Sequence, residues 1–261
     1  MSGQDAQERL LAALDRHPAL TIAVSGGVDS MTLAFVAHRF STARIALIHA
    51  VSPAVPRHAT TRVRDYARRE RWALTVVGAG EFDDPQYRSN PVNRCYYCKS
   101  HLYDRIASLC DTPIASGTNV DDLGDFRPGL AAAAERQVVH PYIEAGVDKA
   151  TLRDIARRHG LDDLAQLPAQ PCLSSRVETG IAIDADDLAF VDRVEQAVAT
   201  FAGATTPVRC RITHAGVVVE FGDGSRVDPE ATDVARALCD ASGRVFLGVR
   251  AYRQGAAFLR S

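Results

Sequence analysis

The strongest chemical signal in the sequence is the run Ser25-Gly26-Gly27-Val28-Asp29-Ser30. Two adjacent glycines let the backbone approach an anion closely, and the N–H groups at the start of a following helix would hold that anion. The hydroxyl groups of Ser25 and Ser30 add donors, and the carboxylate of Asp29 suits a Mg²⁺ ion that bridges phosphates. An ordinary strand-to-helix turn with a polar cap is the alternative. The motif predicts a nucleotide-binding turn in which Ser25, Gly26, Gly27, Asp29 and Ser30 contact ATP, without the Lys of a Walker A loop.

A second segment, Ser116-Gly117-Thr118-Asn119, has the small residues that allow close approach of a nucleotide. Gly117 and Thr118 are therefore predicted to contact ATP as well. The carboxylates of the following stretch could bind Mg²⁺; the charged residues there are Asp121, Asp122, Asp125 and Arg127. An acidic surface loop is the alternative interpretation.

The cysteines suggest metal or sulfur chemistry. Cys95 and Cys98 form a C-x-x-C, and Cys172 lies in Pro171–Arg176. Zinc normally takes four protein ligands, and no fourth partner stands out beside these three cysteines, although His101 is the nearest candidate. Three thiolates suit a [4Fe-4S] cluster that keeps one iron for an external ligand such as sulfide. Alternatively, Cys172 is a lone nucleophile or sulfur donor that the nearby Arg176 activates. The remaining three cysteines have core-like neighbours; they are Cys110, Cys210 and Cys239.

Two sets of arginines also need an interpretation. Arg209 and Arg211 alternate along an expected strand, which suits either a bound phosphate or a structural ion pair. Four arginines share one face of an expected helix over residues 56–71; they are Arg57, Arg64, Arg68 and Arg71. Because Asp65 and Glu70 interrupt that face, a solvated surface is favoured over an RNA-binding ridge.

Alternating strands and helices are expected to position these residues. The expected strands are residues 21–24, 45–48, 74–77 and 113–116, and the expected helices are 4–16, 29–40, 56–71, 99–109 and 148–159. A polar loop is expected between residues 78 and 94. This order predicts an α/β fold with a parallel sheet covered by helices on both faces.

The order of elements changes after Gly180. A helix over 184–201 precedes β-rich runs at 208–212 and 217–221, and then a helix over 229–239 precedes a β run at 244–249. We therefore expect a domain of residues 1–170, which contains the nucleotide-binding turn, and a smaller α+β domain of residues 171–261.

Composition limits the function classes. The chain has 261 residues, 46% of them hydrophobic and 24% charged, with a formal net charge of −2. No charged, apolar leader or membrane-spanning run stands out, which predicts a cytoplasmic protein without membrane contact. The balanced charge gives no support for a nucleic-acid partner.

The segments described so far, in this order, resemble the LarE family of ATP-dependent sulfur transferases. These belong to the pyrophosphatase-loop (PP-loop) superfamily, whose fold is that of the adenine-nucleotide α-hydrolases. The resemblance covers nearly the whole chain. Its segments are the loop at 25–30, residues 90–91, 94–99, 117–122, 127–129 and 171–176, the expected strand with Arg209 and Arg211, and residues 248–253.

The resemblance implies a definite chemistry. ATP would adenylate a carboxylate of pyridinium-3,5-dicarboxylate mononucleotide, and sulfur would displace AMP to leave a thiocarboxylate, a step of nickel-pincer cofactor biosynthesis. Cys95, Cys98 and Cys172 would hold a [4Fe-4S] cluster that passes on a sulfide, or Cys172 would give up its own sulfur. Residues 1–170 would bind ATP, and residues 171–261 would serve substrate binding, sulfur transfer and oligomerisation. Arg209 or Arg211 would bind the substrate phosphate, and the chain would form a homo-oligomer.

The resemblance also leaves two points open. Glu195 is a weaker candidate for a metal-binding carboxylate, and residues 253–256 depart from the Arg-Thr-Gly-Ser expected of the family. Two other classes share the phosphate loop. A tRNA thiolase should carry an RNA-binding domain or a strongly basic surface, and an NAD-synthetase-like amide-forming enzyme leaves the cysteines without a role.

Overall fold

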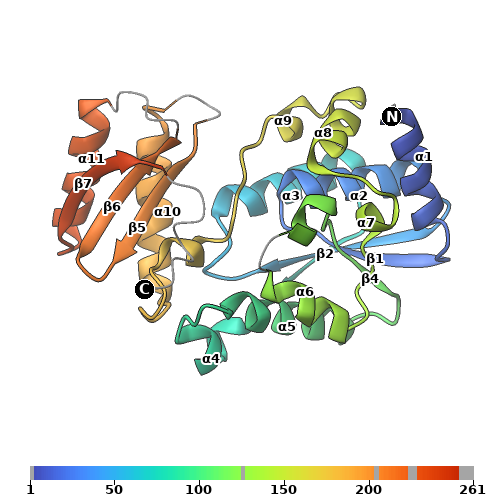
Figure 1. Cartoon of the computed structure of the whole chain (residues 1–261), viewed down its shortest axis with the longest axis horizontal. Helices are drawn as coiled ribbons and strands as arrows, with labels where there is room; N and C mark the ends of the chain where they lie inside the picture. The colour runs from blue at the N-terminus through green and yellow to red at the C-terminus, as the bar shows by residue number, and fades with distance from the viewer. Residues whose placement is uncertain (1–2, 125–126, 203–205, 223–227, 253–261) are drawn as a thin grey trace. The chain divides into compact units, whose positions relative to one another are not determined.

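The computed structural model describes residues 3–124, 127–202, 206–222 and 228–252 (Figure 1). Asp125 and residues 253–256, both considered above, lie outside these ranges. The contacts divide the chain into two units. Unit 1 comprises Met1–Ser52, Arg57–Asp84 and Asn93–Leu167, and unit 2 comprises Pro53–Pro56, Pro85–Val92 and Pro168–Ser261.

Unit 1 is built on a parallel sheet of four strands in the order β3-β2-β1-β4. The strands are β1 (Ala19–Ala23), β2 (Arg44–Val51), β3 (Leu74–Gly78) and β4 (Ile114–Ala115). Ile22 in the centre of β1 pairs with Leu47 of β2 on one side and with Ala115 of β4 on the other. The predicted α/β fold with a parallel sheet is confirmed.

Helices cover both faces of this sheet (Figure 1). They are α1 (Gly3–Leu14), α2 (Val28–Phe40), α3 (Arg57–Glu70), α5 (Arg94–Ala107), α6 (Pro128–Glu135), α7 (Pro141–Glu144), α8 (Lys149–Arg158) and α9 (Asp162–Ala165), with 3-10 turns η1 (Glu81–Asp83) and η2 (Val120–Gly124). Successive residues of a strand point to opposite faces. Accordingly, Leu47 packs in the larger core with residues of α1, α2, α3, α8 and α9, whereas Ile48 packs in a smaller core with residues of α5 and α6.

The prediction of a helix over residues 99–109 was wrong about where the helix begins. Helix α5 begins at Arg94, so Cys95 and Cys98 lie within its first turns instead of in a loop before it. Asn93 begins the helix by accepting a bond from the Tyr96 amide at 2.8 Å. The stretch 78–94 is not one loop either, because it contains η1 and the short helix α4 (Pro85–Arg88). The polar composition of this stretch conceals its turns.

Unit 2 contains a three-stranded mixed sheet in the order β5-β6-β7. Its elements after α4 are η3 (Leu173–Arg176), α10 (Ala185–Ala199), β5 (Val208–Thr213), β6 (Gly216–Phe221), α11 (Pro229–Ala241) and β7 (Phe246–Ala251). Strands β5 and β6 are antiparallel, and β6 and β7 are parallel. The expected α+β character of this part of the chain is confirmed.

Asn90 explains why Pro85–Val92 belongs to unit 2. The residue is fully buried and has a left-handed backbone with φ of 54°. Its side-chain amide nitrogen lies 2.9 Å from the carbonyl oxygens of Glu178 and Ile181. One asparagine therefore fastens α4 to the loop that follows η3. Within the described ranges, we find no helix with the length and apolar character required to cross a bilayer.

Candidate active site

Ser25–Ser30 forms a tight turn between β1 and α2, which we call the phosphate turn. It lies where the carboxyl edge of the sheet meets the start of a helix. Gly26 has φ of 86°, a conformation that favours glycine. A Cβ on Gly26 would lie 2.7 Å from the carbonyl oxygen of Ala59 on α3, so space also demands a glycine there. Gly27 is the N-cap of α2 and provides no side chain to cap it. The first amide groups of α2 are consequently available to an anion.

Two hydroxyl groups hold the turn in shape. Ser30 is buried, and its Oγ lies 3.0 Å from the amide nitrogen and 3.1 Å from the Oγ of Ser25. The guanidinium of Arg62 on α3 donates to the carbonyl oxygen of Gly26 at 2.7 Å. Side chains of the protein thus brace the turn from two sides, as expected for a preorganised phosphate site.

The carboxylate of Asp29 accepts hydrogen bonds from two residues that lie far along the chain. Lys149 Nζ lies 2.6 Å from each of its carboxylate oxygens, and Asn119 Nδ2 lies 3.2 Å from Oδ1. The hydroxyl of the buried Tyr142 donates to the Asp29 carbonyl oxygen at 3.2 Å. Sequence reasoning missed Lys149 and Tyr142 because they follow Asp29 by more than a hundred residues and lack a local motif.

The second predicted segment lies directly beside the first. A Cβ added to Gly117 would lie 2.7 Å from the backbone nitrogen of Ser30, so the two segments pack backbone against backbone. Ser116 Oγ joins Thr118 Oγ1 at 2.9 Å and His140 Nδ1 at 2.8 Å. Burial lowers the pKa of His140, while the nearby carboxylate of Asp122 opposes this effect.

Asp121 and Asp122 stabilise the conformation of their own segment through hydrogen bonds and an ion pair. Asp121 Oδ2 accepts from the Lys149 amide at 3.0 Å. Asp122 accepts from the Asn119 amide at 3.0 Å and pairs with Arg127 at 2.7 Å. In this arrangement Asp29 is the carboxylate of the phosphate turn itself and the better candidate for a Mg²⁺ ligand.

A buried histidine supports the turn from behind. His49, at the end of β2, places Nδ1 2.8 Å from the carbonyl oxygen of Val24 and Nε2 2.9 Å from Thr60 Oγ1. Because a carbonyl oxygen can only accept, Nδ1 carries the proton and Nε2 accepts from Thr60. Burial lowers the pKa of His49, so the ring stays neutral. The geometry of unit 1 therefore fits a nucleotide phosphate chain held by backbone amides, hydroxyls and one carboxylate.

The predicted residues of unit 2 gather around η3. Cys172 is the N-cap of η3 and is partly exposed. The buried guanidinium of Arg176 donates to the carbonyl oxygens of Pro171 at 2.7 Å and Cys172 at 3.1 Å. It also forms a two-pronged pair with Glu195 at 2.9 and 3.0 Å. In this structure Glu195 anchors Arg176, which in turn fixes the backbone that carries Cys172; a metal-binding role for Glu195 stays a prediction.

The two arginines of β5 have different environments, one matching a structural ion pair and the other open to a bound anion. Arg211 is in a buried ion pair, since its Nε lies 2.7 Å from Glu220 Oε2. Arg209 instead donates to two carbonyl oxygens, those of Val208 at 2.8 Å and Ala169 at 2.6 Å. Its buried Nε has no hydrogen-bond partner among the described residues. Burial, followed by the nearby charge of Arg176, lowers the pKa of Arg209.

Buried guanidinium groups outnumber the carboxylates beside them around η3 and β5. The group contains three buried arginines and two glutamates; its members are Arg176, Arg209, Arg211, Glu195 and Glu220. Arg250 also joins Glu220, at 2.8 Å, but from an exposed position. Buried charge of one sign is costly unless it is matched. An anion such as a phosphate monoester would provide negative charge beside the unmatched arginine.

The cysteines are divided between the units. Cys95 and Cys98 lie one helical turn apart on α5 of unit 1, and Cys172 lies in unit 2. No three His, Cys, Asp or Glu side chains of the described ranges form a group able to hold a metal ion. His101, the candidate zinc ligand, lies 2.9 Å from Asp84. A thiolate set of this kind suits an iron–sulfur cluster, which stays a prediction.

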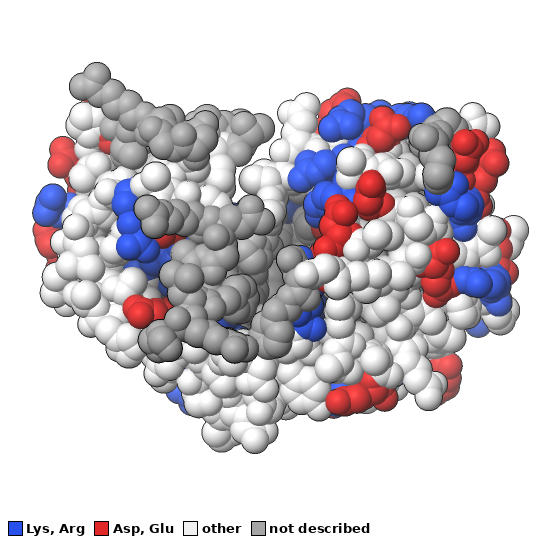
Figure 2. Space-filling model, in the orientation of Figure 1, with Lys and Arg blue, Asp and Glu red and all other residues white. Residues whose placement is uncertain are grey.

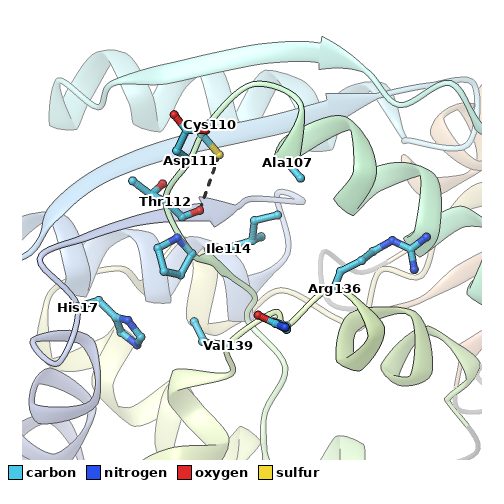
Figure 3. Close-up of a pocket in the computed structure, with 10 residues that line it drawn as sticks. His17, Ala107, Cys110, Asp111, Thr112, Ile114, Arg136 and Val139 are labelled. Carbon is cyan, nitrogen blue, oxygen red and sulfur yellow. Dashed lines mark hydrogen bonds between the residues drawn. The ribbon is translucent and has the colours of Figure 1, made fainter.

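The other cysteines differ from one another. Cys210 and Cys239 are fully buried, as predicted, and burial raises the pKa of both thiols. Cys110 is only partly buried and lines a pocket of about 450 Å³ near the amino ends of β1 and β4 (Figure 3). This pocket, which His17, Thr112 and Arg136 also line, lies at the sheet edge opposite the phosphate turn.

The arginines of α3 form a solvated face, as predicted. Arg57, Arg64, Arg68 and Arg71 are exposed, and Arg68 pairs with Asp65. Lys/Arg and Asp/Glu side chains are interspersed on the visible face of unit 1 (Figure 2).

Comparison with known proteins adds the evolutionary context. No protein-family model matches the chain. Over 67% of its length the chain is 39% identical to an uncharacterised protein of Synechocystis sp., of whose length it spans 66%. It is 23% identical to an uncharacterised protein of Methanocaldococcus jannaschii, with 91% of this chain and 92% of the relative aligned. It is also 26% identical, over 77% of its length and 74% of the relative, to the pyridinium-3,5-bisthiocarboxylic acid mononucleotide synthase of Lactiplantibacillus plantarum. The chain is therefore a distant relative of that synthase.

Proposed function

We propose that this chain is an ATP-dependent sulfur transferase that acts on pyridinium-3,5-dicarboxylate mononucleotide in nickel-pincer cofactor biosynthesis. A substrate carboxylate oxygen attacks the α-phosphorus of ATP and expels pyrophosphate, which leaves an acyl-adenylate. A sulfur nucleophile then attacks the acyl carbon and expels AMP, which leaves a thiocarboxylate. Adenylation is needed because the oxygen of a free carboxylate is a poor leaving group.

The observation that carries this proposal is that buried arginines outnumber their carboxylate partners near Cys172, the residue at the start of η3. Arg209 lacks a carboxylate partner among the described residues and keeps one buried N–H without an acceptor. Such a group is costly unless it binds an anion. The phosphate of a mononucleotide is such an anion, and Arg209, with Arg211 next to it on the strand face, would bind it.

The residues of unit 1 would perform the adenylation. Backbone amides of the phosphate turn and the hydroxyls of Ser25 and Ser30 would bind the ATP phosphates, with Gly117 and Thr118 closing the other side. Asp29 would hold Mg²⁺, which neutralises phosphate charge when bound. For the sulfur source we propose a [4Fe-4S] cluster on Cys95, Cys98 and Cys172, whose open iron site would supply a sulfide. The homo-oligomer and the cytoplasmic location remain predictions from the resemblance and the composition.

The test is a product assay with the purified protein. Mg·ATP, a sulfide source and pyridinium-3,5-dicarboxylate mononucleotide are incubated with it, and pyrophosphate and product mass are measured. We expect pyrophosphate release that depends on the mononucleotide, together with the mass gain for replacing an oxygen by a sulfur. Nicotinic acid adenine dinucleotide with ammonia and unmodified tRNA are the comparison substrates. Turnover of either one in place of the mononucleotide would overturn the proposal.

A further inference from the structure

The two lysines of this chain stand out against its other basic residues. Of thirty lysines and arginines, twenty-eight are arginine, and the lysines are Lys99 and Lys149. The buried ion pairs of unit 2 are all made by arginine. Asp29 in the phosphate turn is instead paired with Lys149. A lysine carries a compact ammonium on a flexible stem, whereas an arginine presents a rigid planar fork.

The backbone of Lys149 is fixed, and the hydrogen bonds of its side chain to described residues are made by the ammonium at the tip. Asp148 caps α8 by accepting from the Thr151 amide at 2.8 Å, and Asp121 accepts from the Lys149 amide at 3.0 Å. The ammonium lies 2.6 Å from both Asp29 oxygens. The Lys149 side chain is 33% exposed, so the tip can leave without unpacking a core.

Asp29 does not depend on Lys149 for its position. Asn119 donates to its carboxylate at 3.2 Å, and Tyr142 donates to its carbonyl oxygen at 3.2 Å. Neither group carries a positive charge that would compete with a metal ion. If the ammonium leaves, the carboxylate therefore stays in place and regains its full negative charge.

We propose that Lys149 is a positioning residue that occupies Asp29 until Mg·ATP arrives and then moves to the phosphates. This inference rests on the proposed use of ATP by the turn. An uncompensated carboxylate would repel the phosphates, and the ammonium removes that repulsion before binding. Asp29 would then hold Mg²⁺ through its carboxylate, and the released ammonium would lie next to an anion that it can pair with. The charge of the turn stays matched at each stage.

An arginine at this position would behave differently. A guanidinium binds a carboxylate through two parallel hydrogen bonds, and such pairs are strong. It would compete harder with Mg²⁺ for Asp29 and would leave less readily. The proposal therefore depends on the compact shape of the Lys149 ammonium as well as on its positive charge.

The test compares Lys149→Arg, Lys149→Met and the control Arg158→Met. Arg158 lies on the same helix and forms an exposed pair with Asp154, so its loss changes the net charge equally, away from the turn. ATP binding is measured by calorimetry over a series of Mg²⁺ concentrations, and thermal unfolding is measured beside it. In Lys149→Arg, we expect the half-saturating Mg²⁺ concentration to rise about tenfold, the effect of one tight pair. In Lys149→Met, we expect ATP affinity to fall at least about tenfold without a higher Mg²⁺ requirement.

Each outcome is decisive. An unchanged Mg²⁺ requirement in Lys149→Arg would overturn the inference, even if Lys149→Met proved too unstable to assay. A fall in affinity that only follows a fall in unfolding temperature would mean a structural role and overturn it as well. If the wild-type protein bound no Mg·ATP, the proposed function would fail and the inference with it. Wild-type binding with unchanged variants would refute the inference alone.

Discussion

Gly117 lies so close to Ser30 that a Cβ added to the glycine would be 2.7 Å from the Ser30 amide nitrogen. The two residues are far apart in the sequence, but their backbones pack against each other and form the two sides of the proposed phosphate site. A single methyl group at position 117 would therefore push against the first turn of α2.

Gly117→Ala should damage ATP binding more than folding. Overpacking of this kind costs about 1–3 kcal/mol, and the displaced amide of Ser30 would leave the phosphate site misshapen. We expect ATP affinity to fall at least about tenfold, the equivalent of about 1.4 kcal/mol, by calorimetry. Gly124→Ala is the matched control, since an added Cβ there meets no atom within 4 Å. Equal affinities for the two variants would show that the contact is not limiting.

His49 should make stability fall in mild acid. Burial lowers its pKa in the folded protein, so the unfolded chain takes up a proton first as pH falls below the ordinary value of about 6.5. The free energy of unfolding should therefore be fully present above that value and decline below it, by at most about 1.4 kcal/mol per pH unit for each such histidine. His140 and His159 shift in the same direction and add to the slope.

The contribution of His49 can be isolated with His49→Gln, measured by urea unfolding between about pH 5 and 8. Glutamine keeps polar atoms in the site but does not titrate. We expect a shallower pH slope than in the wild type. An identical slope would mean that the unfolded chain and the folded protein bind protons equally at this position.

Arg209→Met should separate stability from substrate binding. The variant removes a buried cation that lacks a carboxylate partner among the described residues, and such replacements are often neutral or stabilising. We expect its unfolding temperature to be no lower than that of the wild type. Stabilisation by the mononucleotide should disappear at the same time. Arg193→Met, an exposed arginine on α10, serves as the control and should keep that stabilisation. A large drop in unfolding temperature for Arg209→Met would contradict the interpretation as an anion site.

Iron analysis tests the sulfur source. Protein purified without oxygen should contain about four irons per chain with matching acid-labile sulfide, and visible absorbance typical of such clusters. Cys95→Ala and Cys172→Ala should lose both, whereas Cys110→Ala, outside the proposed ligand set, should keep them. An iron-free wild type would rule the cluster out. Cys172 should then lose the elements of H₂S during turnover, which mass spectrometry would detect.

Sequence periodicity was sufficient for the main framework of the fold. All four strands of the parallel sheet were predicted, because short apolar runs bounded by glycine or polar residues are typical of buried strands. The short helices α6, α7 and α9 were missed. In α6 the four alanines at 131–134 give no amphipathic period, and four-residue helices such as α7 are too short to show one.

The candidate site was predictable only in part. Ser25–Ser30 and Gly117 carry local motifs, and the structure places them together. The partner of Asp29 could not be deduced, because Lys149 begins an ordinary amphipathic helix and its role depends on the crossover connections of the sheet. The same holds for Glu195 and Glu220, whose pairing with Arg176 and Arg211 follows from tertiary packing.

The hydrogen bonds made by the Asn90 side chain limit the order in which unit 2 can fold during synthesis. Its amide binds the carbonyl oxygens of Val177, Glu178 and Ile181, which lie 87 to 91 residues later in the chain. At typical translation speeds of about 5–20 residues per second, helix α4 leaves the ribosome several seconds before its binding partners exist. Unit 2 therefore cannot complete its folding as its first segments emerge. Until residues 177–181 have been translated, the side chain of Asn90 lacks its native acceptors, so these bonds can form only after the segment that carries Cys172 has been made.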